Sequence, residues 1–220
     1  MQTVYTHLNN RNSRFFMYDL LTQFQTLIID DFSQFRLTLK SMLLKLGIRQ
    51  VDQAVNGLEA IKLCSENDYD IIFCDYNLGD GQDGQQILEE LHERKILRKN
   101  TLFILVTAET TSARVMGAIE FRPDAYLTKP FSAEQLGQRL KRLVSKNQVL
   151  SPIHQAIDDG HIQRALQLCD QVIQQAPTLR FSCLRLKSEL LELEQQYDQA
   201  MALYQQVAEE QDLLWALLGI

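Results

Sequence analysis

Three carboxylates in the first two thirds of this 220-residue chain follow apolar runs. Asp30 and Asp31 end one such run, and Asp75 comes directly after Ile71-Ile72-Phe73-Cys74. Carboxylates held close together repel one another and need a cation, and Mg²⁺ suits oxygen ligands. With the ion bound, one carboxylate can attack a phosphoryl donor and form an acyl phosphate. These residues therefore predict magnesium-assisted phosphoryl transfer, with Asp75 as the nucleophile.

Two further side chains with suitable chemistry end later apolar runs. Thr107 can donate a hydroxyl hydrogen bond to a phosphoryl oxygen, and Lys129 can neutralise the charge of that group. Phosphoryl transfer depends mainly on positioning and charge neutralisation, so a lysine near the transferring oxygens is expected. Asn77, two residues beyond Asp75, would add its backbone carbonyl as a further metal ligand.

Five short apolar runs alternate with longer helix-period segments, which predicts a parallel sheet flanked by helices. The predicted strands are 26–30, 51–55, 71–74, 102–106 and 125–127. Each connection is long enough for a right-handed crossover. In such a sheet, functional groups gather beyond the carboxyl ends of the strands. The acidic residues, Thr107 and Lys129 are therefore expected to meet there.

Capping residues predict the helices between these strands. Ser33 would cap a helix over 34–46, which Gly47 would end. Asn56-Gly57 precedes 58–67, Asp83-Gly84 precedes 85–94, and Ser132 precedes 133–144.

After Lys146 the strand-like pattern is replaced by helical segments rich in Gln, Leu and Ala, with a boundary predicted near 147–152 at Asn147, Ser151 and Pro152. A pattern at 162, 165, 169 and 172 recurs 35 residues later at 197, 200, 204 and 207. This period favours an array of helical hairpins. The last residues, from Trp215, resemble the opening of a third hairpin. We therefore expect a fragment of a longer repeat protein, with a natural capping helix as the alternative.

The charge is unevenly distributed. Residues 1–148 carry 18 Lys or Arg and 18 Asp or Glu, whereas residues 149–220 carry 4 and 10. An acidic tail repels phosphate backbones, so we expect no nucleic-acid binding by this chain. The apolar runs are too short to span a bilayer, and no secretory leader is evident, which makes the cytoplasm the default location. The cysteines form no metal or disulfide pattern.

The segment from about Gln25 to Lys146 resembles a bacterial two-component response-regulator receiver domain. The resemblance rests on Leu27-Ile28-Ile29-Asp30-Asp31, Ile72-Phe73-Cys74-Asp75-Tyr76-Asn77-Leu78, Leu105-Val106-Thr107-Ala108 and Tyr126-Leu127-Thr128-Lys129-Pro130-Phe131. It implies a flavodoxin-like five-stranded parallel fold.

For the site, the resemblance implies a phosphoacceptor at Asp75 and Mg²⁺ held by Asp30, Asp31, Asp75 and the Asn77 carbonyl. Phosphate sensing would fall to Thr107 and Lys129, with Tyr126 as the switch aromatic. The Lys129-Pro130 bond is expected to be cis, and the side chains of Asn77 and Glu109 would control water access.

One loop departs from the family pattern. The family usually carries a proline where this chain has Gly79, and its Asp-Gly pair comes about one residue earlier than Asp83-Gly84. Because glycine has wide backbone freedom, we expect this loop to be longer and more flexible. The departure affects the expected loop geometry and not the chemistry.

The tail resembles tetratricopeptide repeats. The expected organisation is a leader of unknown structure (1–24), a receiver domain (25–147) and tetratricopeptide-like repeats (148–220). The leading interpretation is a signalling phosphoacceptor, which is not an ordinary enzyme although it would catalyse its own phosphorylation and hydrolysis. Its partners would be a sensor histidine kinase or phosphotransfer protein and a protein bound by the repeats. A homodimer is a further expected assembly. The alternatives are a phosphorylation-independent scaffold or dimerisation module and a DNA-binding regulator.

Overall fold

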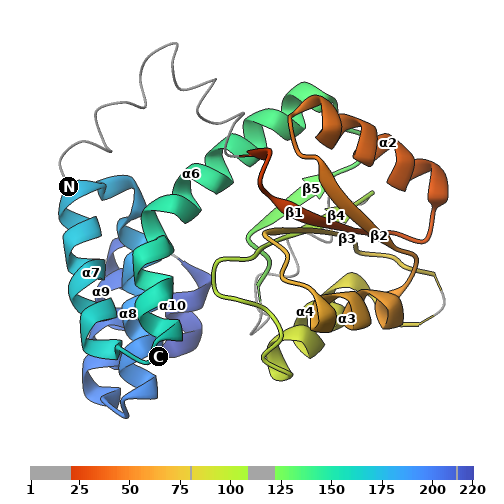
Figure 1. Cartoon of the computed structure of the whole chain (residues 1–220). Coiled ribbons are helices and arrows are strands. Elements are labelled where there is room, and N and C mark those ends of the chain that lie inside the picture. Colours follow the sequence, from red (N-terminus) through yellow and green to blue (C-terminus); the bar gives the residue numbers. More distant parts are fainter. Residues whose placement is uncertain (1–20, 80, 109–121, 212) are drawn as a thin grey trace. The chain divides into compact units, whose positions relative to one another are not determined.

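The computed structural model describes residues 21–79, 81–108, 122–211 and 213–220 (Figure 1). Contacts divide the chain into two compact units. Of the described residues, the first unit contains those within 21–108 and 123–143, and the second contains Arg122 and those within 144–220. We call them the receiver unit and the helical unit. Within the described residues, no helix is long and apolar enough to cross a membrane.

The receiver unit contains a five-stranded parallel sheet in the order β2-β1-β3-β4-β5. Its strands are β1 (Gln25–Ile29), β2 (Gln50–Ala54), β3 (Ile71–Asp75), β4 (Leu102–Thr107) and β5 (Ala125–Thr128). The predicted doubly wound sheet is therefore confirmed, with strand ends displaced by no more than one residue. The strand order reverses between β1 and β3, which is where such sheets form ligand sites.

Helices cover both faces of this sheet (Figure 1). Helix α2 (Ser33–Lys45) and the first part of α6 (Ala133–Asp158) lie on one face, whereas α3 (Gly57–Glu66) and α4 (Gly84–Glu93) lie on the other. Every residue of β4 is buried, as are the first four of β3. Burial on both faces explains why these strands are continuous apolar runs in the sequence.

Three of the predicted helix starts are confirmed. The Asn56 side chain accepts a hydrogen bond from the Glu59 N–H, and Asp83 and Ser132 form capping boxes with residues three positions later. Ser33 was wrongly predicted as a cap, because it is already the first helical residue of α2. At that position the Asp30 carboxylate accepts the Phe32 N–H from just before the helix.

The prediction that a helix ends at Val144 was also wrong. Helix α6 continues to Asp158 and contains Pro152 within it. A proline inside a helix removes one intrahelical hydrogen bond and crowds the preceding turn, yet α6 continues through Pro152, and Asn147 and Ser151 do not end it. The stop comes at Gly160, whose φ of 72° lets the His161 N–H reach the Ala156 carbonyl at 2.8 Å.

The helical unit continues from α6 through four helices and a short 3₁₀ turn. These are α7 (Ile162–Gln175), η2 (Pro177–Leu179), α8 (Arg180–Leu193), α9 (Tyr197–Glu210) and α10 (Leu214–Gly219). Two apolar clusters hold them together. One joins the end of α6 to α7 and α8, and the other joins α8 to α9 and α10.

The backbone of the helical unit repeats with the 35-residue spacing seen in the sequence. Helices α7 and α9 have equal length and start 35 residues apart. The turns before them match as well, because Gly160 and Gln195 both have positive φ and are followed by equivalent 2.8 Å hydrogen bonds. The small residues Ala165 and Ala200 are buried at corresponding places.

This correspondence predicts that Gln195→Gly stabilises the helical unit. Gln195 has a φ of 60°, a left-handed conformation that costs a residue with a Cβ about 1 kcal/mol, whereas glycine adopts it freely. The free energy of unfolding should rise by about that amount, measured by denaturant titration of Trp215 fluorescence. The reciprocal change Gly160→Gln should lower it. If the two variants had the same free energy of unfolding, the equivalence of the turns at Gly160 and Gln195 would be contradicted.

Candidate functional site

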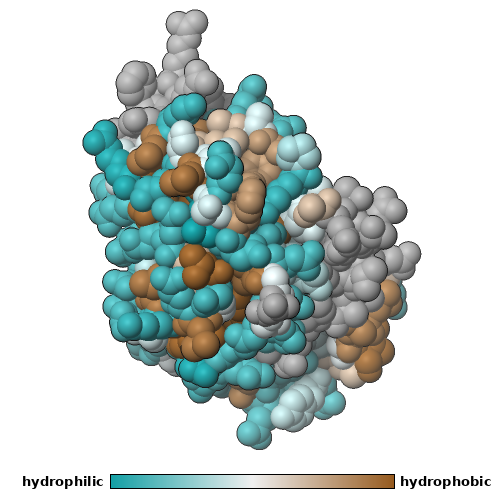
Figure 2. All heavy atoms as spheres, turned by 90° about the vertical axis from the view of Figure 1, so that its right-hand side faces the viewer, coloured by the Kyte–Doolittle hydropathy of each residue, from teal (hydrophilic) through white to brown (hydrophobic). Residues whose placement is uncertain are grey.

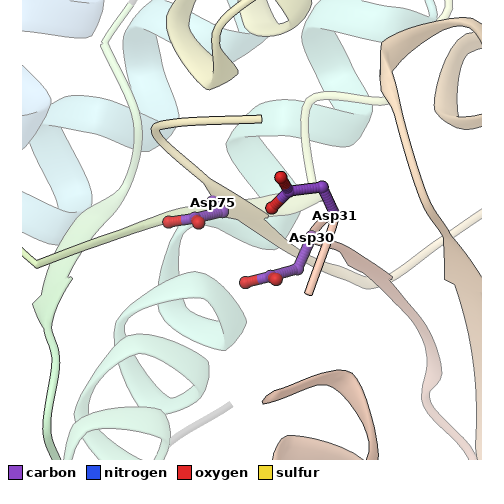
Figure 3. A group of neighbouring side chains, drawn as sticks. All are labelled: Asp30, Asp31 and Asp75. Carbon is purple, nitrogen blue, oxygen red and sulfur yellow. The ribbon is translucent and has the colours of Figure 1, made fainter. Parts of the chain in front are cut away.

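Three carboxyl groups converge at the carboxyl ends of β1 and β3 (Figure 3). One ligand oxygen from each of Asp30, Asp31 and Asp75 lies within 4.8 Å of the others. Asp30 and Asp31 directly follow β1, and Asp75 is the last residue of β3. Because these strands are neighbours in parallel register, their ends bring the predicted acidic residues together.

Asp30 is buried and firmly held, with only 1% of its side chain exposed. One carboxylate oxygen accepts the Phe32 N–H at 2.8 Å, and the other accepts from the Lys129 ammonium at 2.9 Å. The Asp30 backbone carbonyl accepts from the Arg36 guanidinium at 2.6 Å. Sequence reasoning missed Arg36, because only folding brings the first turn of α2 onto this carbonyl.

The Lys129 ammonium lies between two acidic groups. It is 2.9 Å from Asp30 Oδ2 and 3.1 Å from Asp75 Oδ2, and its side chain is 21% exposed. The Lys129 N–H donates to the Thr107 carbonyl at 2.7 Å, which continues the β4–β5 ladder beyond the strand. The Lys129-Pro130 bond is cis, so that prediction is confirmed. A positive charge thus occupies the position expected of the phosphate-sensing lysine.

Asp75 experiences opposing electrostatic effects. Burial raises the pKa of its carboxyl group above 3.8, and the neighbouring Asp30 carboxylate adds to the rise. The Lys129 charge and hydrogen bond lower the pKa, but burial is the larger effect. The metal-free site therefore disfavours the ionised form of Asp75, which is the form needed for metal binding and nucleophilic attack.

The remaining predicted residues lie around this centre. Thr107 is buried at the end of β4, opposite Thr128 in the ladder. Tyr126 is half-buried on β5 between the buried Ala125 and Leu127, so its ring lies on the opposite face of the strand from theirs. Asn77 is exposed in the turn after Asp75. Glu109 lies outside the described residues.

The loop after Asp75 explains the departure from the family pattern. Gly79 has a φ of 70°, which proline cannot adopt, and a Cβ there would lie 3.2 Å from Asp31 Oδ2. The Gly84 N–H donates to the Tyr76 carbonyl at 2.8 Å, so the far end of the loop is tied back beside Asp75. The Asp-Gly pair signals this helix start in the sequence, but the close approach of Gly84 to β3 is visible only in the structure.

Gly84 leaves no room for a side chain. A Cβ there would overlap the Asp75 carbonyl oxygen and lie 2.7 Å from Leu105 Cδ2. Gly84→Ala should therefore lower the free energy of unfolding by about 2 kcal/mol, measured by thermal unfolding. Gly57→Ala is the matched control at the start of α3, where the nearest atoms belong to side chains at 3.0–3.1 Å that can move. An equal loss in both variants would contradict this explanation.

The fold and the site define a receiver-type phosphoacceptor domain, and comparison with known proteins agrees. Residues 26–141 match the response regulator receiver domain family, so the chain belongs to that family. The chemotaxis protein CheY-3 of Vibrio cholerae is 29% identical over 120 residues, which cover 54% of this chain and 91% of that protein. The chemotaxis protein CheY of Pseudomonas aeruginosa is 28% identical and is covered to 95%.

Two solved structures are also similar in sequence to this chain. A Francisella response regulator receiver domain is 29% identical and covers 56% of this chain and 98% of its own, with a TM-score of 0.49. The response regulator TrrA of Thermotoga maritima, solved in complex with Mg²⁺ and BeF, is 28% identical, with coverage of 55% and 99% and a TM-score of 0.46. The family match ends at residue 141, before the helical unit begins.

The donor set fits a hard divalent cation. Among the described residues, Asp30, Asp31 and Asp75 form a group of carboxylates that lie close enough together to bind one metal ion. Asp31 is exposed and Asp75 is 13% exposed, so both present oxygens to an incoming ion. Asp30 would act from the inner side with the lone pairs that its two hydrogen bonds leave free. Mg²⁺ accepts such a partly hydrated carboxylate site.

Neutralising Asp75 should stabilise the metal-free protein. Because the carboxylate form is disfavoured, Asp75→Asn should raise the free energy of unfolding at pH 7 in EDTA. The wild-type group binds its proton more tightly when folded, so its relative stability is greatest below pH 3.8 and declines as the pH rises above that value. The difference between the two proteins should therefore disappear near pH 3.8.

Excess Mg²⁺ should reverse the order at pH 7, because only the wild type retains all three carboxylates for the ion. Denaturant titrations at both pH values, with and without Mg²⁺, provide the measurement. Asp31→Asn is the matched control: it removes an exposed carboxylate, so it should weaken the Mg²⁺ response with less gain in EDTA. A less stable Asp75→Asn variant in EDTA would refute this description of the site.

Proposed function

We propose that this chain is a response regulator that accepts a phosphoryl group on Asp75 with the aid of Mg²⁺. The observation that carries this proposal is the Lys129 ammonium, 2.9 Å from Asp30 and 3.1 Å from Asp75. It supplies a fixed positive charge where the phosphoryl oxygens of an acyl phosphate on Asp75 would lie. Such preorganised charge is the main source of catalysis in phosphoryl transfer.

Each residue of the site would have a separate role in the phosphoryl transfer. An Asp75 carboxylate oxygen forms a bond to the phosphorus of the donor, while the bond from phosphorus to the leaving group breaks and its electrons depart with that group. Lys129 exchanges its contact with Asp75 for a phosphoryl oxygen, and the Thr107 hydroxyl donates to another. Asp30, Asp31, Asp75 and the Asn77 carbonyl would hold Mg²⁺, which neutralises charge on the carboxylates and the phosphoryl group.

Phosphorylation would act on protein contacts through Thr107 and Tyr126. Tyr126 lines a groove of about 240 Å³ between β5 and the start of α6, together with Pro130, Phe131 and Arg139. Movement of the Thr107 hydroxyl toward the phosphoryl group would alter the packing around Tyr126 on β5 and the surface that β5 forms.

The helical unit would provide the output. Its 35-residue repetition and buried small residues support a tetratricopeptide-like array, a type of scaffold whose stacked helices present surfaces to protein partners. Its acidic charge favours such partners over nucleic acid. Large apolar side chains remain exposed on it, namely Leu193, Tyr197, Leu217, Leu218 and Ile220.

The receiver unit also presents a surface for its phosphoryl donor. On the face shown in Figure 2, hydrophobic side chains lie among hydrophilic ones. The large exposed apolar residues of this unit are Phe32, Leu37, Leu44, Val55 and Leu58. We propose a sensor histidine kinase or a phosphotransfer protein as the donor, a homodimer as a further assembly, and the cytoplasm as the place of action. The chain would act as a signalling phosphoacceptor that catalyses its own phosphorylation and hydrolysis.

Intact-mass analysis after incubation with Mg²⁺ and acetyl phosphate or phosphoramidate tests this function. The wild type should gain one phosphoryl group, and Asp75→Ala should gain none, because the nucleophilic oxygen is absent. Lys129→Ala should slow the reaction at least tenfold, which corresponds to about 1.4 kcal/mol of lost transition-state stabilisation. Asp83→Ala is the control, because it removes a carboxylate that caps α4 and leaves the acidic cluster unchanged.

An adduct that persists in Asp75→Ala, or no adduct on any protein, would remove Asp75 from this role. The receiver unit would then be a phosphorylation-independent scaffold or dimerisation module.

A further inference from the structure

We propose that Phe35 is a positioning residue for Lys129, and that its ring holds the ammonium in place during phosphoryl transfer. This inference rests on the proposed function of Asp75 as phosphoacceptor. The Lys129 Nζ atom lies over the Phe35 ring, 3.9 Å from its centroid. A cation at this distance is attracted by the negative face of the ring.

The geometry gives the ammonium three neighbours at once. Two are the carboxylate oxygens of Asp30 and Asp75, and the third is the face of Phe35. An ammonium has three N–H donors and, in water, would satisfy them all with solvent. Here the ring covers one side of a group that is only 21% exposed. Reduced access to water strengthens the attraction of the ammonium to both carboxylates and to the ring.

Neighbouring residues fix the ring itself. The Phe131 ring packs edge-on against Phe35, with centroids 6.0 Å apart and an interplanar angle of 87°. The next residue on α2, Arg36, donates to the Asp30 carbonyl at 2.6 Å. The first turn of α2 is therefore attached to the site through Arg36 and to the segment after β5 through the two rings. Phe35 is therefore held in place by Phe131 and by the neighbouring Arg36, independently of its contact with Lys129.

This arrangement has a consequence for the reaction. When Asp75 becomes an acyl phosphate, the carboxylate that Lys129 contacts loses its charge, and the ammonium must turn to a phosphoryl oxygen. The attraction of the ring does not depend on which oxygen the ammonium faces. Phe35 can thus hold Lys129 near the reacting atoms while one oxygen partner replaces another, which reduces the reorganisation needed in the transition state.

Fluorinated phenylalanines at position 35 distinguish this role from simple packing. Substitution with one, two and three ring fluorines progressively weakens the negative face while changing the shape little. The rate of Asp75 phosphorylation by phosphoramidate, followed by intact mass, should fall stepwise with each added fluorine. The total fall should be about threefold to tenfold, the range expected of a partly desolvated cation–π contact. Phe35→Leu should give a fall of similar size.

The matched control is the same fluorine series at Phe103, a buried residue near the opposite end of β4. The Phe103 ring is buried in the core away from the carboxyl ends of the strands, so the rate of Asp75 phosphorylation should stay constant across this series. A rate at position 35 that does not change with fluorination would overturn the proposal, as would an equal decline at position 103.

A second measurement needs no phosphorylation, so it separates this inference from the proposed function. In NMR spectra, the ε-methylene protons of Lys129, assigned with Lys129→Arg, should be shifted upfield by the ring current of Phe35. Phe35→Leu should abolish that shift, whereas Phe32→Leu, which removes a side chain that is 64% exposed, should preserve it. A Lys129 signal unaffected by Phe35→Leu would overturn the contact. An unreactive wild type that retains the shift would overturn the proposed function instead, and with it the role of Phe35 in catalysis.

Discussion

The contact of the Lys129 ammonium with two carboxylates is the interaction on which this site depends. One oxygen from each of Asp30, Asp31 and Asp75 lies within 4.8 Å of the others, and like charges at that distance repel one another. Lys129 offsets part of this repulsion, although burial still raises the pKa of Asp75. A divalent ion such as Mg²⁺ would offset the charge repulsion that one lysine leaves.

The surrounding fold keeps these charges in place. The central strands β3 and β4 are buried along almost their whole length, so Asp75 and Thr107 project from a rigid support. Segments on either side then close in on the strand ends. Gly84 ties the following loop to Tyr76, and the first turn of α2 contacts Asp30 through Arg36 and Lys129 through Phe35. The chemistry thus depends on helix starts and loops that only a parallel sheet brings to one edge.

The helical unit is stabilised in a different way from the receiver unit. It is built from nearest-neighbour packing, with each helix burying its apolar face against the next, as in quasi-one-dimensional arrays. The positive-φ turns at Gly160 and Gln195 set where each hairpin folds back. Family membership rests on residues 26–141 alone, so the proposed role of the helical unit depends on its own repetition and charge.

The sequence by itself determined the five strands and their parallel pairing, the acidic cluster and the 35-residue helical period, whereas the strand order came from the structure. These features depend on local apolar patterns and on residue types that follow each strand. It did not determine that α6 continues through Pro152, because helix ends depend on whether a competing turn is available, and that turn lies at Gly160. Tertiary structure alone decided the roles of Gly84, Arg36 and Phe35. The residues that they contact are distant in the sequence or lie on other elements. A local sequence pattern therefore cannot predict which backbone group or charge will lie next to them in the folded chain.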